Sequence, residues 1–302
     1  MKQDTLILAH YYAPIGVQRI AHYVGDSLEL AKKAQQEDAS RIVFAGVRFM
    51  AETAKVLNPE ATIILPDWNS TCSLVEQTDI DEMRQWREKY ADSTHVMYIN
   101  SSVQQKALAD WIVTSRNVEP VVSHLLSEGK DIIFSPDKNM GIYLNRKLGV
   151  NMPVWTAVCE VHDKFDRNRM EERYAKHDSD KRFMIAHPES PIGILDMADF
   201  VSSTKGMLSW VDEFDGPEGS VIYIATENEL VEIMKERRPD LSIWQVPVIG
   251  NCRCNECPYM KLNIMSAVKK AIDGSGGTVI DYISEHDMEA ARKPIERMMQ
   301  FS

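Results

Sequence analysis

Cysteines are the residues of this chain whose type and spacing bear most directly on chemistry, and there are five of them. Cys252, Cys254 and Cys257 form a tight trio, whereas Cys72 and Cys159 stand alone. Structural zinc normally takes four ligands from paired C-x-x-C elements, and only Cys254 and Cys257 make such a pair. The spacing also differs from the runs that hold ferredoxin-type clusters. The trio therefore indicates a metal or redox site of another kind, with incidental thiols as the alternative.

Two cysteines stand where a helix is expected to begin. Cys257 precedes Pro258, which suits the first turn of a helix, so the sequence predicts Cys257 at a helix N-cap and Cys72 in a comparable place. Free N–H groups there favour the thiolate, the form that binds metal. Cys72, Cys159 and Cys257 are separated by 87 and 98 residues. Three such thiolates on one iron–sulfur cluster would leave one iron open to act as a Lewis acid.

Side chains suited to proton transfer follow two of the expected strands. The segment His10–Tyr12 follows the first strand, and His187 and Glu189 follow a later one. Histidine and glutamate can be tuned toward neutral pH for acid–base work, although a hydrogen-bonded loop residue is the alternative for each. Asp26 and Glu29 have the spacing of a helix capping box.

Hydroxyl and amide groups recur at the same kind of place. Thr114-Ser115, Ser203-Thr204 and the segment Tyr98–Asn100 each follow an expected strand. Such residues usually form turns or cap helices, so only their shared placement after strands indicates that they bind a ligand.

Short apolar runs rich in β-branched residues are expected to be the strands that position these groups. They are Thr5–Leu8, Arg41–Phe44, Thr62–Leu65, Val96–Ile99, Trp111–Val113, Ile132–Phe134, Val154–Val158, Phe183–Ile185, Val221–Ile224 and Ile243–Val246. Amphipathic stretches between them predict helices, among them Leu28–Gln36, Met50–Leu57, Val103–Asp110, Val231–Arg237 and Leu262–Ile272. This alternation predicts parallel sheets, whose sites form at the carboxyl ends of the strands.

The polar residues at strand ends recur with a weak period. His10, Asn100 and His187 are separated by 90 and 87 residues, close to the spacing of the isolated cysteines. Such a period predicts three similar α/β units that face a common centre, each delivering one thiolate. The expected units share little sequence identity. On spacing alone, a chance recurrence is therefore as good an explanation as three repeated units.

Composition bounds the class of protein. With 302 residues, 44% hydrophobic and 26% charged, the chain is globular and long enough for two or more domains. A net charge of -11 excludes a general binder of nucleic-acid backbones but leaves small basic pockets open. There is no G-x-G-x-x-G and no Walker A run. No apolar run is long enough for a membrane helix or a signal peptide, so we expect a cytoplasmic protein.

A series of short motifs runs over nearly the whole chain. They are Ala9–Tyr12, Gly25–Ala31, Ala45–Lys55, Tyr98–Ser101, Lys106-Ala107, Thr114-Ser115, Pro136–Asn139, Cys159–His162, His187–Glu189, Ser203-Thr204, Cys257–Met260 and Glu296–Met298. In these motifs the chain resembles the quinolinate synthases, iron–sulfur enzymes of NAD biosynthesis.

The resemblance implies a fold of triplicated three-layer α/β/α units with parallel sheets around a pseudo-threefold axis and an active site at the centre. The expected units are 1–80, 81–170 and 171–261, with the segment 262–302 joining the first. Cys72, Cys159 and Cys257 would hold a 4Fe–4S cluster with one open iron. The implied reaction condenses iminoaspartate with dihydroxyacetone phosphate, with loss of phosphate and two waters, while the open iron acts as Lewis acid.

Residue roles also follow from the resemblance. Tyr12 and Glu189 are the first expectations for proton transfer, followed by His162 and His187. The expected substrate-binding residues are His10, Ser27, Tyr98, Asn100, Ser115, His187, Ser203 and Thr204. An iminoaspartate-producing enzyme could hand over its product, and neither nucleic acid nor membrane is expected as a partner.

Departures from the family pattern leave other readings open. One branch of the family carries C-x-x-C-x-x-C, whereas Cys252, Cys254 and Cys257 run C-x-C-x-x-C, so a disulfide between Cys252 and Cys254 is an open question. A metal or redox sensor that uses this trio is the alternative function. A metal-free aldolase would need a Schiff-base lysine, for which Lys138 is the available choice.

Overall fold

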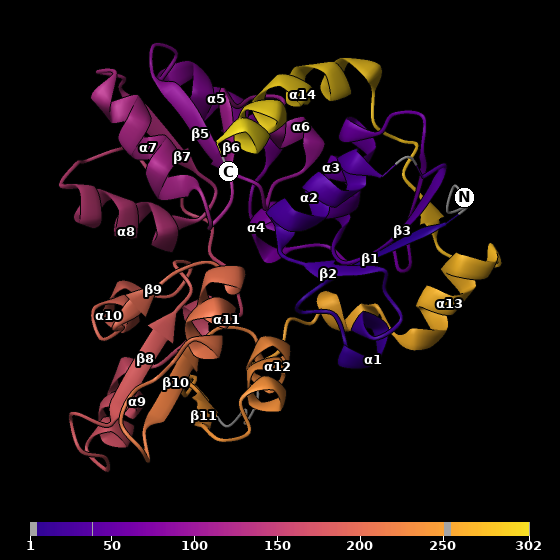
Figure 1. Cartoon of the computed structure of the whole chain (residues 1–302). Coiled ribbons are helices and arrows are strands. Elements are labelled where there is room, and N and C mark those ends of the chain that lie inside the picture. Colours follow the sequence, from indigo (N-terminus) through magenta and orange to yellow (C-terminus); the bar gives the residue numbers. More distant parts are fainter. Residues whose placement is uncertain (1–4, 38, 251–254, 302) are drawn as a thin grey trace.

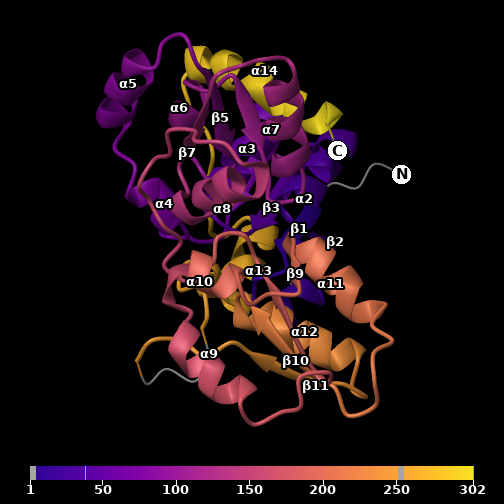
Figure 2. The same cartoon turned by 90° about the vertical axis from the view of Figure 1, so that its left-hand side faces the viewer.

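The computed structural model describes residues 5–37, 39–250 and 255–301, and it forms three α/β parts, each built on its own sheet (Figure 1). The predicted α/β class with several parallel sheets is confirmed. The third part extends away from the other two in both views (Figure 2). A threefold relation between the parts stays a prediction.

The first part has a five-stranded sheet in the order β12-β4-β3-β1-β2, parallel except for β12. Its strands are β1 (Leu6–His10), β2 (Tyr23–Gly25), β3 (Arg41–Ala45), β4 (Thr62–Leu65) and β12 (Thr278–Val279). Its helices are α1 (Ile15–Gln18), α2 (Ser27–Gln36), α3 (Arg48–Leu57), α4 (Ser73–Glu76) and α13 (Met265–Asp273).

Helices cover both faces of this sheet, which explains the unbroken apolar strands. Ile42 and Phe44 pack into the cluster that contains α2 and α3, whereas Val43 packs with Val268 of α13 on the opposite face. Because successive side chains of a strand point to opposite faces, a strand covered on both sides must be apolar throughout. The result is a three-layer α/β/α unit.

The second part has the three-stranded sheet β6-β5-β7. Its strands are β5 (Thr94–Tyr98), β6 (Trp111–Val113) and β7 (Ile132–Ser135). Its helices are α5 (Ile80–Lys89), α6 (Val103–Lys106), α7 (Val118–Ser127) and α8 (Lys138–Leu148), followed by the turn η1 (His162–Lys164). The C-terminal helix α14 (Glu285–Gln300) packs on β6, α6 and α3, so the segment 262–302 contributes to two parts.

The third part has the four-stranded sheet β11-β10-β8-β9. Its strands are β8 (Arg182–Ala186), β9 (Phe200–Val201), β10 (Val221–Ala225) and β11 (Ser242–Gln245). Its helices are α9 (Arg167–Tyr174), α10 (Ile192–Leu195), α11 (Thr204–Asp212) and α12 (Asn228–Arg237), and the turn η2 (Met260–Leu262) follows them. Helix α9 crosses the expected boundary at residue 170, and its Met170 packs with Met184 of β8.

The predicted strand Val154–Val158 is wrong. The segment makes only isolated bridges, from Val154 to Phe134 and from Ala157 to Asp137. Pro136 follows β7 and has no N–H group, so a continuous ladder beside this strand is interrupted there. The short strands β2, β9 and β12 were not predicted, whereas the three-residue strand β6 was.

The capping box at the start of α2 is confirmed. Asp26 accepts the backbone N–H of Glu29, and the Glu29 carboxylate accepts that of Asp26. This cap begins α2 directly after β2 and so places Ser27 at the end of the first sheet. Within the described ranges, no helix is both long and apolar enough to cross a membrane.

A candidate active site between the three sheets

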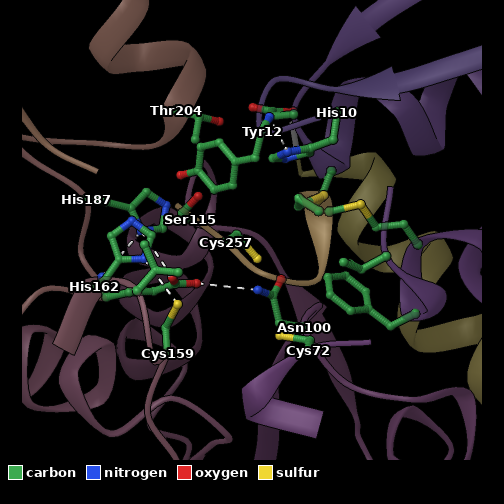
Figure 3. Close-up of a pocket in the computed structure, with 18 of the residues that line it drawn as sticks. His10, Tyr12, Cys72, Asn100, Ser115, Cys159, His162, His187, Thr204 and Cys257 are labelled. Atoms are coloured by element: carbon green, nitrogen blue, oxygen red, sulfur yellow. Dashed lines mark hydrogen bonds and ion pairs between the residues drawn. The ribbon is translucent and has the colours of Figure 1, made fainter. Parts of the chain in front are cut away.

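A cavity of about 60 Å³ lies where the carboxyl ends of the strands of all three parts meet (Figure 3). His10 ends β1, Tyr98 ends β5 and His187 follows β8. The structure thereby brings together nearly all the residues singled out from the sequence. Those that line the cavity are His10, Tyr12, Ser27, Cys72, Tyr98, Asn100, Ser115, Cys159, His162, His187, Glu189, Thr204 and Cys257.

Ser203 is the expected substrate-binding residue that does not line the cavity. Its hydroxyl accepts the backbone N–H of Gly206 and caps α11. The cap places Thr204, which does line the cavity, at the first position of the helix.

Backbone N–H groups lie close to each of the three thiols that line the cavity. Cys72 is the N-cap of α4, as predicted, and the backbone N–H of Leu74 lowers the pKa of its thiol. The N–H groups of His162 and Met260 are directed in the same way at Cys159 and Cys257. Burial raises the pKa of all three thiols, that of Cys257 to about 12, and the N–H groups lower it in part.

This donor set fits a thiolate-bound metal centre. Three half-buried thiols that are far apart in the sequence face one cavity and lie close to N–H groups that stabilise sulfur anions. Their raised pKa values mean that metal binding would have to drive deprotonation, as it does at thiolate sites. Cys252 and Cys254 lie outside the described residues, so their pairing stays open.

The predicted helix N-cap at Cys257 is wrong. A turn follows this residue and leads into the short 3-10 turn η2, and α13 begins only at Met265. The backbone N–H of Cys257 is held by the buried carboxylate of Glu227, which also lies 3.3 Å from Nζ of Lys261. Glu227 follows β10, so the third sheet anchors the cysteine.

His162 joins Cys159 to Glu189. Its Nδ1 lies 2.7 Å from Oε2 of Glu189 and 3.2 Å from Sγ of Cys159. Among the residues that the structure describes, these form the group of potential metal donors whose ligand atoms all lie within 4.8 Å of one another. The sequence had indicated the three residues separately, and their separation along the chain carries no signal of this contact.

Glu189 is held as a carboxylate. Burial alone would raise its pKa, but the neighbouring His162 and hydrogen bonds from His162 and Tyr98 lower the pKa to about 2. Asn100 adds an amide donor at 3.4 Å. At neutral pH this group is a proton acceptor surrounded by donors.

His10 and His187 are neutral donors. Burial lowers the pKa of each to about 3. Nδ1 of His10 accepts the N–H of Tyr12, so Nε2 carries the ring proton in the neutral form. These imidazoles can donate a hydrogen bond without bringing a charge into the cavity.

Helix N-termini supply an anion-binding side. Ser27 and Thr204 are the first residues of α2 and α11, and Ser115 precedes α7. Hydroxyls and free N–H groups at helix N-termini bind carboxylate and phosphate oxygens. Hydrogen-bonding capacity is also left over, since Oδ2 of Asp26 and Oδ1 of Asn100 are buried and have no partner within the described residues.

Two other observations bear on the alternatives. Apolar side chains that the sequence did not indicate, such as Phe49, Met50 and Val161, complete the walls. No lysine lies among the described residues that line the cavity, and Lys138 is the first residue of α8 outside it. The aldolase alternative therefore has no Schiff-base residue in place.

Three sheets around a cavity with thiols, imidazoles and an ionised carboxylate define an α/β enzyme. The family model of the quinolinate synthetase A protein matches residues 1–300. Quinolinate synthases of Synechocystis sp. and Chloroherpeton thalassium are 38% and 39% identical over 99% of this chain, covering 92% and 91% of the relatives' lengths. The quinolinate synthase of Prochlorococcus marinus is 38% identical over 298 residues, 99% of this chain and 87% of the relative. The chain belongs to the quinolinate synthase family.

Proposed function

We propose that the chain condenses iminoaspartate with dihydroxyacetone phosphate and releases phosphate and two waters to form quinolinate. The observation that carries this proposal is the convergence of three thiols, neutral imidazoles and one ionised carboxylate on a single buried cavity. Atoms balance without an oxidant or a reductant, so the residues need only bind, orient and move protons. Small-molecule substrates and a cytoplasmic location belong to this proposal, as does a handover from an iminoaspartate-producing enzyme.

Cys72, Cys159 and Cys257 would hold a 4Fe–4S cluster. When bound, such a cluster with three protein ligands supplies an open iron that acts as a Lewis acid toward a substrate oxygen. The N–H groups at the three sulfurs stabilise the thiolates that this requires.

The remaining residues divide into binding and proton transfer. Ser27 and Thr204 are the first residues of their helices and Ser115 lies in the turn before α7, and their hydroxyls suit the anionic groups of both substrates. Glu189 is ionised at neutral pH and therefore able to accept a proton, and Tyr12 is a phenol whose pKa burial raises well above its usual value. Because its pKa is raised, the Tyr12 phenol stays protonated at neutral pH and can donate a proton to the substrate or to a neighbouring group.

Anaerobic purification followed by iron and sulfide analysis and an assay of quinolinate formation tests the proposal. We expect about four irons per chain and turnover, and loss of iron in Cys72→Ala, Cys159→Ala and Cys257→Ala. The matched control is the double variant Cys252→Ser, Cys254→Ser, which should retain both iron and turnover. A colourless protein with one zinc and no quinolinate would overturn the proposal in favour of the sensor.

A further inference from the structure

Lys106 is a buried lysine that the proposed function does not use. It ends the short helix α6, belongs to one of the short motifs of the sequence and is completely buried. Its Nζ donates to the backbone carbonyl of Ser101, and no other donor reaches that carbonyl from the part of the chain that the structure describes. Within the same part, no carboxylate forms an ion pair with Lys106.

This ammonium lies in an unfavourable place. A buried charge without an ion pair loses the hydration that water provides. Burial lowers the pKa of Lys106 to about 7, and the Glu52 carboxylate opposes the shift only in part. Nζ lies 5.1 Å from the centroid of the Phe49 ring, which lines the cavity, so the ammonium lies close to the cavity wall without lining it. An apolar side chain would fill the same space without this cost, which indicates that the N–H donor has a function.

The Ser101 carbonyl belongs to a tight bend at the end of β5. The backbone N–H of Ser101 donates to the Ile99 carbonyl at 2.7 Å, and its hydroxyl donates to the Tyr98 carbonyl at 2.9 Å. The side chains of Tyr98 and Asn100 line the cavity from this bend. Lys106 therefore holds, from outside the cavity, a stretch of backbone that carries two residues of the site.

The side chain of Asn100 extends from the bend into the cavity (Figure 3). Its Nδ2 lies 3.4 Å from Oε1 of Glu189, whereas its Oδ1 is buried and has no partner among the described residues. An amide oxygen in this state can accept an O–H or N–H group of a bound substrate. Because the 3.4 Å contact is the one hydrogen bond of this side chain within the described ranges, the backbone bend decides where Oδ1 lies.

We propose that Lys106 is a positioning residue whose buried ammonium holds the Ser101 carbonyl and thereby fixes the bend that presents the Asn100 amide to the substrate. This inference rests on the proposed function, in which Asn100 is an expected substrate-binding residue. Lys106 acts on the substrate only through Asn100. It forms and breaks no bond of the substrate.

Two substitutions at the same position separate the N–H donor from the packing. Lys106→Met removes the donor and the charge and leaves a side chain of similar length. We expect kcat/KM to fall about tenfold, since a misplacement of about 1 Å costs up to about 100-fold. Lys106→Gln keeps an uncharged donor of shorter reach, so its kcat/KM should lie between those of the parent protein and Lys106→Met. A value for Lys106→Met within about threefold of the parent, or a value for Lys106→Gln no higher than that of Lys106→Met, would overturn the inference.

A double-mutant cycle with Asn100 tests the route of the effect. Asn100→Ala removes the amide that the lysine positions, so in that background Lys106→Met should lower kcat/KM by less than about threefold. Two sites that act independently would instead give the full loss of about tenfold again. Such additivity would overturn the inference.

Lys55 provides the matched control for a lysine that bonds loop carbonyls. Its Nζ donates to the carbonyls of Pro59 and Ala61 at 2.7 and 3.0 Å, and Lys55 does not line the cavity. Lys55→Met should keep kcat/KM within about threefold of the parent protein. Iron content should be equal in the parent and in both methionine variants. A loss of kcat/KM in Lys55→Met equal to that in Lys106→Met, or a loss of iron in Lys106→Met, would overturn the inference.

Crystal structures of the anaerobic holoproteins separate this inference from the proposed function. In Lys106→Met we expect the Ser101 carbonyl and the Asn100 amide to leave the positions that they keep in Lys55→Met. This readout needs no turnover, so it decides the positioning role even if the parent protein makes no quinolinate. Unchanged Ser101 and Asn100 positions in Lys106→Met would overturn it.

Discussion

Nδ1 of His162 lies 2.7 Å from Oε2 of Glu189, and the two side chains are 1% and 3% exposed. The same carboxylate lies 3.7 Å from Nδ1 of His187. Hydrogen bonds from His162 and Tyr98 help to keep the Glu189 carboxylate ionised in a place where burial alone would protonate it. The site can therefore keep a proton acceptor ready beside neutral donors.

Glu189→Gln should abolish this acceptor while preserving its size. We expect kcat to fall by about 10²- to 10⁴-fold, the usual contribution of a general acid or base, because an amide oxygen does not take up the proton. Steady-state kinetics with iron analysis measures the effect. The control is Glu128→Gln at the surface, where Glu128 pairs with His124. Turnover within threefold of the parent in Glu189→Gln would contradict the role of this carboxylate.

Glu29 connects the three parts through its contacts with Arg116 and Lys205. Its Oε1 lies 3.8 Å from a guanidinium nitrogen of Arg116 and 3.8 Å from Nζ of Lys205, while its other oxygen completes the capping box. Glu29→Gln keeps a capping box and removes the charge. Because these pairs are partly exposed, we expect the unfolding free energy to fall by less than about 1 kcal/mol.

Glu29→Ala should cost about 1 kcal/mol more than Glu29→Gln, since it also removes the cap acceptor. Thermal unfolding midpoints at low and high salt measure both the ion-pair contribution and the capping contribution of Glu29. Added salt should reduce the difference between the parent protein and Glu29→Gln and should leave the difference between the two variants unchanged. Equal stability of the two variants would show that the cap does not stabilise α2.

The sequence predicted the long strands because both faces of each are covered. Strand β10 is apolar throughout and β3 is apolar after Arg41, whereas β9 and β12 have two residues each and carry no pattern. Val154 belongs to an apolar run too, but its side chain packs against Gly141 of α8 rather than into a sheet. An apolar run alone does not show whether a segment forms a strand of a sheet or packs against a helix.

Part of the site could be predicted from the sequence, because polar residues at the carboxyl ends of the strands meet in a fold of parallel sheets. Thr226 has the same placement after β10 as His187 has after β8. A threonine after a strand is usually a turn residue, so nothing in the sequence distinguished it. Only its contacts with Tyr12 and His162 do.

Gly141 is required where α8 crosses the segment that was predicted as a strand. A Cβ at this position would lie 2.4 Å from Cγ1 of Val154 and 3.1 Å from the Phe134 ring. We expect Gly141→Ala to destabilise the protein by about 1–3 kcal/mol, the usual cost of overpacking. The matched control is Gly16→Ala in α1, where the nearest atom is 3.7 Å away and no loss is expected. Equal unfolding midpoints for the two variants would contradict the close approach.

His95 of β5 is a buried histidine away from the cavity. Its Nδ1 lies 3.1 Å from the Leu108 carbonyl and its Nε2 lies 2.7 Å from Oγ of Ser135. The carbonyl can only accept, so Nδ1–H donates to it and, in the neutral ring, Nε2 accepts from Ser135. Burial lowers the pKa of His95 to about 4; the Leu108 carbonyl and Asp110 oppose the shift, and the nearby Arg87 reinforces it.

A histidine with a lowered pKa in the folded state makes stability depend on pH with a definite sign. The unfolded chain takes up a proton below a pKa of about 6.5 and the folded chain only below about 4. The free energy of unfolding is therefore unaffected above pH 6.5 and falls as the pH drops from 6.5 to 4. Between pH 7 and pH 5 the loss from this one group is about 2 kcal/mol.

His95→Gln should remove this loss, because glutamine offers a donor and an acceptor and does not titrate. Equilibrium urea unfolding at pH 7 and pH 5 measures it. We expect the variant to be less stable than the parent at pH 7 but to lose about 2 kcal/mol less on going to pH 5. His124→Gln makes the same substitution at an exposed position and is the control for loss of a histidine as such. His10 and His187 titrate alike in all three proteins, so a pH-dependent loss in His95→Gln equal to that of the parent would show that His95 does not stay neutral in the folded chain.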